Sequence, residues 1–148
     1  MALIVQKYGG TSVGTVERIQ AVADKVAKTH RAGNQVVVVV SAMSGETDRL
    51  LGLANEISAR AAGRELDVLL STGEQVTSAL LSLALHERGI KAESRTGGQV
   101  SIRTDSAFNK ARIEEISAEN VKSALGGGAV IVVAGFQGTN ALGDITTL

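Results

Sequence analysis

The sequence contains no cysteine, no proline and no tryptophan, and these absences narrow what the chain can be. Without cysteine, both a disulfide framework and a thiolate metal site are excluded. Aromatic residues make up only 2% of the chain, so it offers no platform on which nucleic-acid bases would stack. At average usage roughly seven prolines would be expected, and we have no physical account of their absence.

Excess charge of either sign is also missing, because 15 basic residues balance 15 acidic ones. This balance argues against a nucleic-acid surface and against a polybasic membrane anchor. The apolar runs, Val36–Val40 among them, are too short to cross a membrane, and the start of the chain lacks a signal-peptide pattern. The 148 residues, 44% of them hydrophobic, suit one domain with an aliphatic core. We therefore expect a cytoplasmic protein with neither a membrane nor a nucleic-acid partner.

Strand-like and helix-like patterns alternate along the chain and predict an α/β fold. Apolar residues at helical spacing predict helices over 15–30, 46–62 and 71–88, with Ile57 and Leu83 among the inward-facing positions. Strands are predicted over 1–8, 35–40, 90–94, 110–116 and 129–134, while the apolar run 66–70 suits either a helix or a strand. The strands 35–40 and 129–134 are continuously apolar, as expected of strands buried on both faces of a parallel sheet. In such sheets ligands bind at the carboxyl ends of the strands.

The stretch Lys7–Gly14, with the sequence KYGGTSVG, leads from the first predicted strand through a glycine turn toward a helix. A turn of this kind offers free backbone N–H groups to an anion. The stretch matches neither the G-x-G-x-x-G fingerprint nor a Walker A loop. Lys7 ends a strand that we expect to be buried, where its ammonium needs an anionic partner such as a transferring phosphoryl group. The alternatives are an ordinary turn and a surface lysine.

Polar side chains also flank the next two predicted helices. Ser41 stands at the end of a strand, where it is placed to hydrogen-bond a substrate. Thr47 lies in the first turn of the following helix, for which Ser44 fits the N-cap, and an ordinary helical position is slightly favoured for Thr47 over a binding role. The spacing Ser71-x-x-Glu74 fits a capping box, which is the interpretation that spacing alone favours. The alternative for Glu74 is a carboxylate that faces the site and holds a substrate ammonium. One rotamer cannot fill both roles.

Other polar residues carry weaker signals. The cluster Arg103–Asp105 lies in a segment that we expect to be exposed, where it is either functional or simply solvated. His30 and His86 stand near predicted helix ends and are interpreted as partners of the helix dipoles rather than as ligands. No spacing of His, Asp and Glu predicts a metal site built by the protein.

Five motifs, taken together and in order, resemble bacterial aspartate kinase over the whole chain. They are KYGGTS, VVSAM, STGEQ, RTDSA and VAGFQG, which begin at Lys7, Val39, Ser71, Arg103 and Val133. The resemblance implies the amino-acid kinase (carbamate kinase-like) fold, a three-layer αβα sandwich with a mostly parallel sheet. It implies transfer of the ATP γ-phosphate to the β-carboxylate of L-aspartate, giving 4-phospho-L-aspartate. In bacteria this is the first step toward lysine, threonine, methionine and diaminopimelate.

The resemblance also implies roles for individual residues. Lys7 is expected to stabilise the transferring phosphoryl group, with backbone contacts from Gly9 and Gly10 to the phosphates. The nucleotide would be Mg-ATP, with Mg²⁺ carried by the nucleotide and no metal site in the protein. No proton-transfer base is needed, because the attacking carboxylate is already a nucleophile, so alignment and charge neutralisation would carry catalysis.

For the substrate, the resemblance implies that Ser41 and Thr47 bind aspartate and that Glu74 holds its α-ammonium, which reverses the capping interpretation. Residues 1–148 correspond to an N-terminal aspartate-binding lobe. In the family a nucleotide-binding half and ACT regulatory domains follow, and they are absent from this chain, so we expect the isolated chain to be inactive. The parent enzyme would be a homo-oligomer or would pair with a regulatory chain. Two alternatives stay open: a lobe of another amino-acid or carbamate kinase, and a non-catalytic pseudo-kinase or assembly module.

Overall fold

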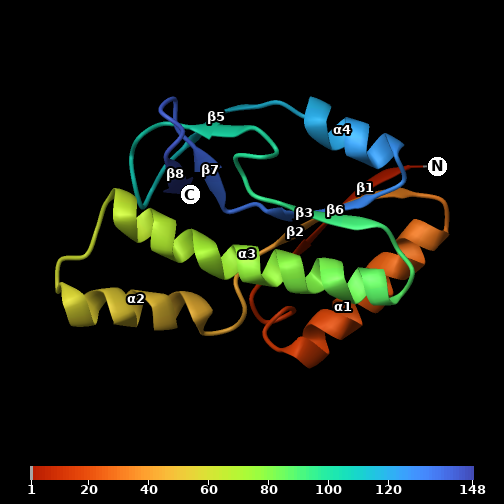
Figure 1. Ribbon diagram of the computed structural model, residues 1–148, viewed down its shortest axis with the longest axis horizontal. Coiled ribbons are helices and arrows are strands. Elements are labelled where there is room, and N and C mark those ends of the chain that lie inside the picture. The colour runs from red at the N-terminus through yellow and green to blue at the C-terminus, as the bar shows by residue number, and fades with distance from the viewer. Residues whose placement is uncertain (1) are drawn as a thin grey trace.

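A computed structural model describes residues 2–148 and shows two four-stranded sheets with four helices (Figure 1). In chain order the elements are β1 (Leu3–Tyr8), α1 (Val16–Arg31), β2 (Gln35–Val40), α2 (Glu46–Ile57), α3 (Arg64–Glu87), β3 (Ala92–Arg95), β4 (Ile102–Thr104), β5 (Ile113–Ile116), α4 (Glu119–Gly126), β6 (Val130–Ala134), β7 (Gln137–Thr139) and β8 (Ile145–Thr147).

The first sheet is parallel throughout, with the strand order β1-β2-β6-β3. Helices α1 and α3 cover one face, and α4 packs against β6 on the other (Figure 1). These three layers confirm the predicted α/β sandwich with a parallel sheet. The second sheet, β5-β4-β7-β8, lies beyond the carboxyl end of β6, because the chain passes from β6 through a two-residue turn into β7.

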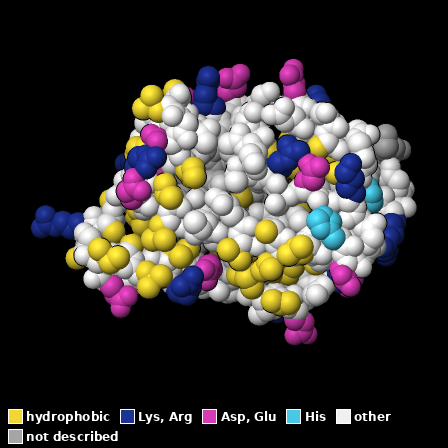
Figure 2. Space-filling model, in the orientation of Figure 1, with side chains coloured by type: hydrophobic (Ala, Val, Ile, Leu, Met, Phe, Trp, Pro, Cys, Tyr) yellow, Lys and Arg dark blue, Asp and Glu magenta, His cyan; other side chains and the backbone are white. Residues whose placement is uncertain are grey.

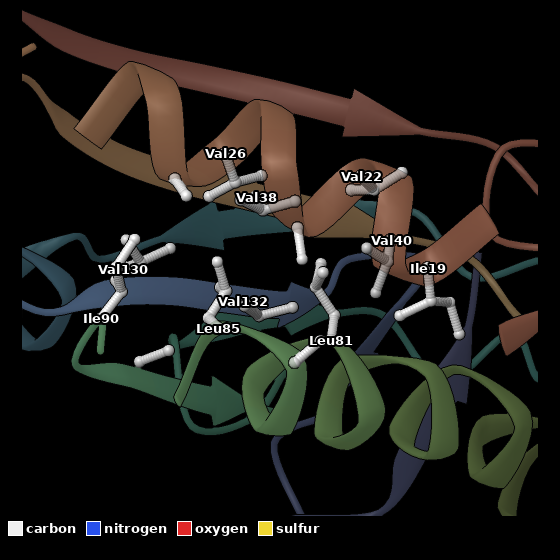
Figure 3. Close-up of a cluster of buried hydrophobic side chains, with 14 of the residues drawn as sticks. Ile19, Val22, Val26, Val38, Val40, Leu81, Leu85, Ile90, Val130 and Val132 are labelled. Carbon is white, nitrogen blue, oxygen red and sulfur yellow. The ribbon is translucent and has the colours of Figure 1, made fainter. Parts of the chain in front are cut away.

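The main core fills the space between the sheet and the helices α1 and α3 (Figure 3). Its buried side chains include Ile19, Val22, Val26, Val38, Val40, Leu81, Leu85, Val130 and Val132. Strand β6 is buried on both faces, as predicted, whereas β2 is fully buried on one face only. The prediction that β2 is buried on both faces is therefore wrong. The short helix α4 packs on β6. On the same face of the sheet, Val37 and Val39 of β2 pack against the smaller core cluster beneath α4 and are only partly buried.

Strand β1 forms an edge of the parallel sheet, which corrects the expectation that it is buried. Leu3, Val5 and Lys7 alternate along one face and are all exposed. The desolvation argument for Lys7 therefore does not hold in this structure. Strand order is a tertiary property, and the apolar pattern of β1 contains no information about it.

Helix α3 begins seven residues earlier than predicted, at Arg64, and runs through Ser71 without a break. The apolar run 66–70 is therefore helical, and Ser71 cannot act as an N-cap. Gly73 lies inside this helix, where an added Cβ would stand 3.0 Å from the Cβ of Ala42. The glycine thus lets α3 approach the turn after β2. By length and composition α3 could cross a membrane, but half of the relevant window is buried inside the molecule, as expected of a core helix.

Two shorter helices also differ from expectation. Helix α2 ends at Ile57 rather than near residue 62. The sequence also predicts a short helix capped by Ser117, with Glu119 in its first turn, but Ala118 is the residue that precedes α4, and no side chain caps it. Ile57 and Leu83, expected to face inward, are 90% and 61% exposed. Figure 2 shows such hydrophobic side chains gathered along the lower edge of the view, where α1, α2 and α3 lie. Apolar periodicity gives the helix but overestimates the width of its buried face.

Candidate functional site

Two adjoining hollows open where β1, β2 and β6 end, and they share Ser41, Ala42 and Thr47. The first, of about 370 Å³, is also lined by Gly10, Thr11, Met43, Ser44, Gly45 and Asp48. The second, of about 300 Å³, is also lined by Leu70, Glu74, Asn109, Phe136, Thr147 and Leu148. The carboxyl ends of the strands are where a parallel sheet is expected to bind its ligand.

Glu74 supplies the buried charge of the second hollow. Its side chain projects from α3, and the residue is only 6% exposed. The N–H of Phe136 donates to Oε1 at 3.0 Å, and the side-chain amide of Gln137 donates to Oε2 at 2.8 Å. These contacts rule out the capping box, since the carboxylate faces the turn after β6 instead of the backbone of Ser71.

The electrostatics of Glu74 favour a cationic ligand. Burial raises the pKa of this carboxyl above its ordinary value, and the two hydrogen bonds counter that shift only in part. Among residues 2–148 no lysine, arginine or histidine forms an ion pair with it. A buried carboxylate without a counterion is costly, and a ligand ammonium entering the hollow would offset that cost.

Ser41 and Thr47 lie on the shared wall of the two hollows. Ser41 is partly buried, and its hydroxyl donates a long 3.3 Å hydrogen bond to the carbonyl of Ala42, which a ligand oxygen can replace. Thr47 is exposed in the first turn of α2. Gly45 precedes that helix as its N-cap residue, in a left-handed conformation (φ 76°) and without a side-chain cap, so the interpretation of Ser44 as the N-cap is wrong. The uncapped helix start opens on the first hollow, where it favours a negatively charged group.

Lys7 and the glycine turn meet the site from β1. The ammonium of Lys7 lies 4.9 Å from the ring centroid of Phe136, which lines the second hollow. Gly10 lines the first hollow, whereas Gly9 is not among its lining residues and accepts a 3.1 Å hydrogen bond from the N–H of Ser12. The structure thus gathers Gly10, Ser41, Thr47 and Glu74 around one cleft. It holds Lys7 beside the cleft through Phe136.

The other polar candidates lie elsewhere. Arg103 is exposed and pairs with Glu115 at 2.9 Å, while Thr104 is buried against Thr146 within the second sheet. His86 lies in the last turn of α3, with its Nε2 2.8 Å from the carbonyl oxygen of Ala92, and His30 lies in the last turn of α1. No group of three potential metal ligands occurs within residues 2–148.

Sequence reasoning assigned no individual role to four residues that shape the second hollow, although the resemblance implies that Gly135 and the turn after it face the site. Gln137 is fully buried, and its amide donates both to Glu74 and to the carbonyl of Ser71, at 3.1 Å. Its motif, VAGFQG, was noted, but no role was assigned to the glutamine. Asn109, Phe136 and Thr147 come from separate loops and strands, and no local spacing links them to Glu74. Residues that only the strand topology brings together cannot be linked to one another from local sequence spacing.

Comparison with known proteins gives a consistent result over the chain. A model of the amino acid kinase family matches residues 2–147. The chain is 64% identical over 148 residues to an aspartokinase of Pseudomonas aeruginosa, and 53% identical over 148 residues to an aspartokinase of Geobacillus stearothermophilus. Each comparison covers 100% of this chain and 36% of the relative. The chain therefore spans 36% of the length of these curated relatives.

Solved structures agree with the sequence comparison. The fold is similar to that of aspartate kinase from Synechocystis, with a TM-score of 0.83 and 51% identity over 99% of this chain and 23% of that one. It is also similar to Escherichia coli aspartokinase III solved in complex with aspartate and ADP, with a TM-score of 0.85 and 26% identity. That comparison covers 100% of this chain and 43% of the other.

Proposed function

The chain belongs to the amino acid kinase family, and we propose that it is the N-terminal, aspartate-binding lobe of an aspartate kinase. The observation that carries the proposal is Glu74, a buried carboxylate that forms no ion pair within residues 2–148 and faces a hollow that Ser41 and Thr47 also line. The similarity to the aspartokinases of Pseudomonas aeruginosa and Geobacillus stearothermophilus supports the choice of aspartate as the substrate.

In this proposal Glu74 accepts the α-ammonium of L-aspartate, and Ser41 and Thr47 donate hydrogen bonds to the substrate. An oxygen of the β-carboxylate attacks the γ-phosphorus of ATP, the bond from that phosphorus to the bridging oxygen breaks, and 4-phospho-L-aspartate and ADP form. No proton has to be removed from the nucleophile. Lys7 stabilises the charge that develops on the transferring phosphoryl group, and the backbone of Gly9 and Gly10 contacts the phosphates. Mg²⁺ would enter with ATP and neutralise phosphate charge.

We further propose that the nucleotide half and the ACT regulatory domains belong to the rest of the enzyme, which would act in the cytoplasm as a homo-oligomer or with a regulatory chain. The exposed edge of β1 supports this division. Leu3 and Val5 face outward on an unpaired edge of a parallel sheet, and such an edge is normally covered. The chain covers 36% of the length of the curated relative from Pseudomonas aeruginosa, which supports the proposal of a lobe rather than a whole enzyme.

The test is a calorimetric titration of the 148-residue chain with L-aspartate, L-glutamate and succinate, which lacks the ammonium. We expect L-aspartate to bind more tightly than the other two. The isosteric variant Glu74→Gln should weaken the binding of L-aspartate by about tenfold or more. The affinity for succinate should stay unchanged, because only the ammonium of aspartate pairs with the carboxylate of Glu74.

Equal binding of L-aspartate to both proteins would contradict the proposed role of Glu74. Preference for L-glutamate would point to another amino-acid kinase, and an absence of heat with every ligand would point to a non-catalytic module. With ATP and L-aspartate together we expect the isolated chain to release no ADP. Aspartate-dependent ADP release by this chain would contradict the assignment of the nucleotide site to another part of the enzyme.

A further inference from the structure

We propose that Asp67 is a positioning residue of the aspartate site, whose buried carboxylate fixes two segments that form the wall of the hollow next to Glu74. This inference rests on the proposed function, since it concerns the same hollow. It assigns a role to a residue that does not line the hollow itself.

Asp67 is completely buried in the first turns of α3. Its carboxylate accepts hydrogen bonds from two residues, each of which donates through both backbone and side chain. The N–H of Asn109 lies 3.0 Å from Oδ2, and its side-chain amide bonds to Oδ1. The N–H of Thr147 lies 2.9 Å from Oδ2, and its hydroxyl lies 2.7 Å from Oδ1. Within residues 2–148 this carboxylate forms no ion pair, so these four donors alone compensate its burial.

The two donor residues are far from Asp67 in the sequence, by 42 and 80 positions, and both line the second hollow. Asn109 adopts the left-handed conformation (φ 70°), which an asparagine reaches only at some cost. Its side chain also accepts a 2.8 Å hydrogen bond from the N–H of Gly63, the residue that precedes α3. Thr147 ends the three-residue strand β8. Segments this short need such an anchor to hold one conformation.

Helix α3 links this anchor to the ammonium acceptor. Asp67 and Glu74 are seven residues apart on one helix, so they stand on the same face, separated by about 10 Å along the axis. Glu74 holds one end of the hollow through Phe136 and Gln137, and Asp67 holds the other through Asn109 and Thr147. A rigid helix therefore sets the width of the hollow, and the width decides which amino acid fits between its walls.

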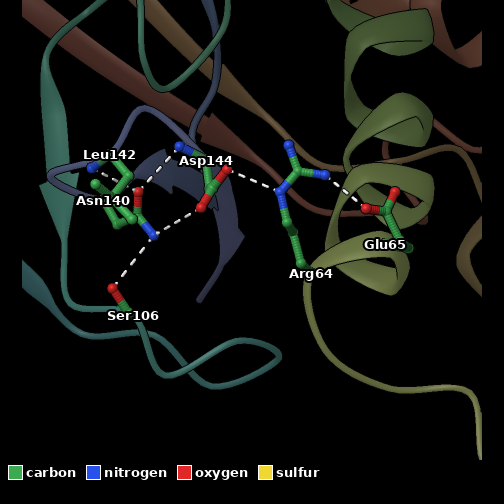
Figure 4. A network of polar contacts seen from close by, with 6 residues as sticks. All are labelled: Arg64, Glu65, Ser106, Asn140, Leu142 and Asp144. Carbon is green, nitrogen blue, oxygen red and sulfur yellow. Dashed lines mark hydrogen bonds and ion pairs between the residues drawn. The ribbon is translucent and has the colours of Figure 1, made fainter.

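A matched control is available in the same region. Asp144 ties the β7–β8 turn to the start of α3 through a 2.8 Å ion pair with Arg64, and it belongs to a separate network with Asn140 (Figure 4). Like Asp67, it joins α3 to the segment around β8. Unlike Asp67, it bonds to no residue that lines the hollow. Asp144→Asn thus weakens another link between α3 and the segment around β8, an ion pair, without touching the wall.

The experiment compares wild type, Asp67→Asn, Thr147→Val, Thr147→Ser and Asp144→Asn in the 148-residue chain. L-aspartate affinity is measured by calorimetry well below each unfolding midpoint, and the amide signals of Asn109 and Thr147 are followed by NMR. Asp67→Asn replaces one carboxylate oxygen, which accepts hydrogen bonds, by an NH2 group that faces the donors of Asn109 and Thr147. We therefore expect L-aspartate to bind about tenfold more weakly and the amide signals of both residues to shift. Thr147→Val should produce a smaller loss, Thr147→Ser should restore affinity because it keeps the hydroxyl, and Asp144→Asn should bind as wild type does.

The outcomes separate this inference from the proposed function. If wild type binds no L-aspartate, the proposed function fails, and this inference fails with it. If wild type binds and folded Asp67→Asn binds equally well, the role of Asp67 alone is overturned. If Asp67→Asn does not fold, Thr147→Val decides: unchanged affinity overturns the inference, and weaker affinity rescued by Thr147→Ser supports it. Equal losses in Asp67→Asn and Asp144→Asn would show a general stabilising role and would also overturn it.

Discussion

The side-chain amide of Gln137 donates a 2.8 Å hydrogen bond to Oε2 of Glu74, joining two buried residues that are 63 positions apart. The same amide donates to the carbonyl of Ser71, one helical turn before Glu74. Gln137 therefore fixes both the carboxylate and the turn of α3 that carries it. Since this carboxylate is the proposed acceptor of the substrate ammonium, its orientation depends on Gln137.

Replacing Gln137 by leucine is expected to weaken both the fold and the site. The change leaves a buried carboxylate oxygen and a backbone carbonyl with fewer donors, which should lower the free energy of unfolding by about 1–3 kcal/mol. Urea denaturation measures that loss, and calorimetry should show weaker binding of L-aspartate.

The neighbouring amide Gln75 provides the control. It is only partly buried, and its contact with the Ser71 hydroxyl is long, at 3.5 Å. We expect Gln75→Leu to change the stability and the affinity much less. If the two variants behave alike, Gln137 does not orient Glu74.

The second prediction concerns pH. Burial raises the pKa of Glu74, so its protonation begins at a higher pH than for an exposed glutamate, whose ordinary pKa is 4.5. A protonated Glu74 cannot pair with an ammonium. The affinity for L-aspartate should therefore fall as the pH is lowered toward this raised pKa. Titrations between pH 8 and pH 5 should show the fall in wild type and not in Glu74→Gln.

Stability should respond to the same proton with the opposite sign. Because the pKa of Glu74 is higher in the folded than in the unfolded state, the folded state binds more protons near that pKa, and stability decreases as the pH rises through it. The partly buried carboxyls Glu46, Glu93 and Asp144, each hydrogen-bonded to an arginine, have lowered pKa values and act in the reverse direction. The difference in unfolding free energy between wild type and Glu74→Gln isolates the effect of Glu74. A flat difference from pH 5 to pH 8 would contradict the prediction.

The third prediction follows from Gly73, which lies inside α3. Alanine in a helix is favoured over glycine by about 1 kcal/mol, but here its Cβ would meet that of Ala42 at 3.0 Å. Relieving this contact moves α3 away from the turn that carries Ser41. We therefore expect Gly73→Ala to raise the free energy of unfolding by less than about 1 kcal/mol and to weaken the binding of L-aspartate.

Gly52, exposed in α2, is the matched control, because nothing lies within 4 Å of an added Cβ there. Gly52→Ala should raise the free energy of unfolding by about 1 kcal/mol and leave the affinity unchanged. Thermal unfolding and calorimetry of the two variants test the comparison. An equal gain in both, with unchanged affinity, would mean that Gly73 is not needed for the approach of α3.

Local sequence pattern was sufficient to predict two features whose structure follows from their own residues. The continuous apolar run of β6 predicts burial on both faces, which the structure shows. The stretch Asn140–Gly143, with the sequence NALG, predicts a hairpin turn, and it joins the antiparallel strands β7 and β8. Pattern failed where a local rule competed with packing. Ser71-x-x-Glu74 satisfies the capping rule, yet the run 66–70 continues the helix backward to Arg64, and Glu74 bonds to residues after β6.

The wall of the hollow was beyond prediction for a different reason. A polar residue such as Asp67 in the first turn of a helix is usually exposed, and only the folded chain brings Asn109 and Thr147 to it. Ser41 was a candidate from its position at a strand end, whereas Thr47 and Glu74 entered the predicted site through a family resemblance. Local pattern alone favoured a cap at Glu74 and slightly favoured an ordinary helical position for Thr47.

The last prediction separates the role of Lys7 in the fold from its proposed role in catalysis. Lys7 is exposed on an edge strand, and its ammonium lies over the ring of Phe136, 4.9 Å from the centroid. Lys7→Met in the 148-residue chain should therefore change the free energy of unfolding by no more than about 0.5 kcal/mol. In the enzyme proposed to contain this chain, the same change should lower kcat by about 100-fold, the scale seen when one group that stabilises transition-state charge is removed.

The KM for L-aspartate should change far less, because the ammonium of Lys7 lies beside Phe136, at the edge of the hollow that Glu74 holds. Lys25→Met, on the exposed face of α1, controls for the loss of one positive charge. A steady-state assay of ADP formation gives both constants. Unchanged kcat in Lys7→Met would exclude this lysine as the phosphoryl-stabilising cation. A rise in KM alone would instead show that it binds the substrate, since an interaction made equally in the ground and transition states leaves kcat unaltered.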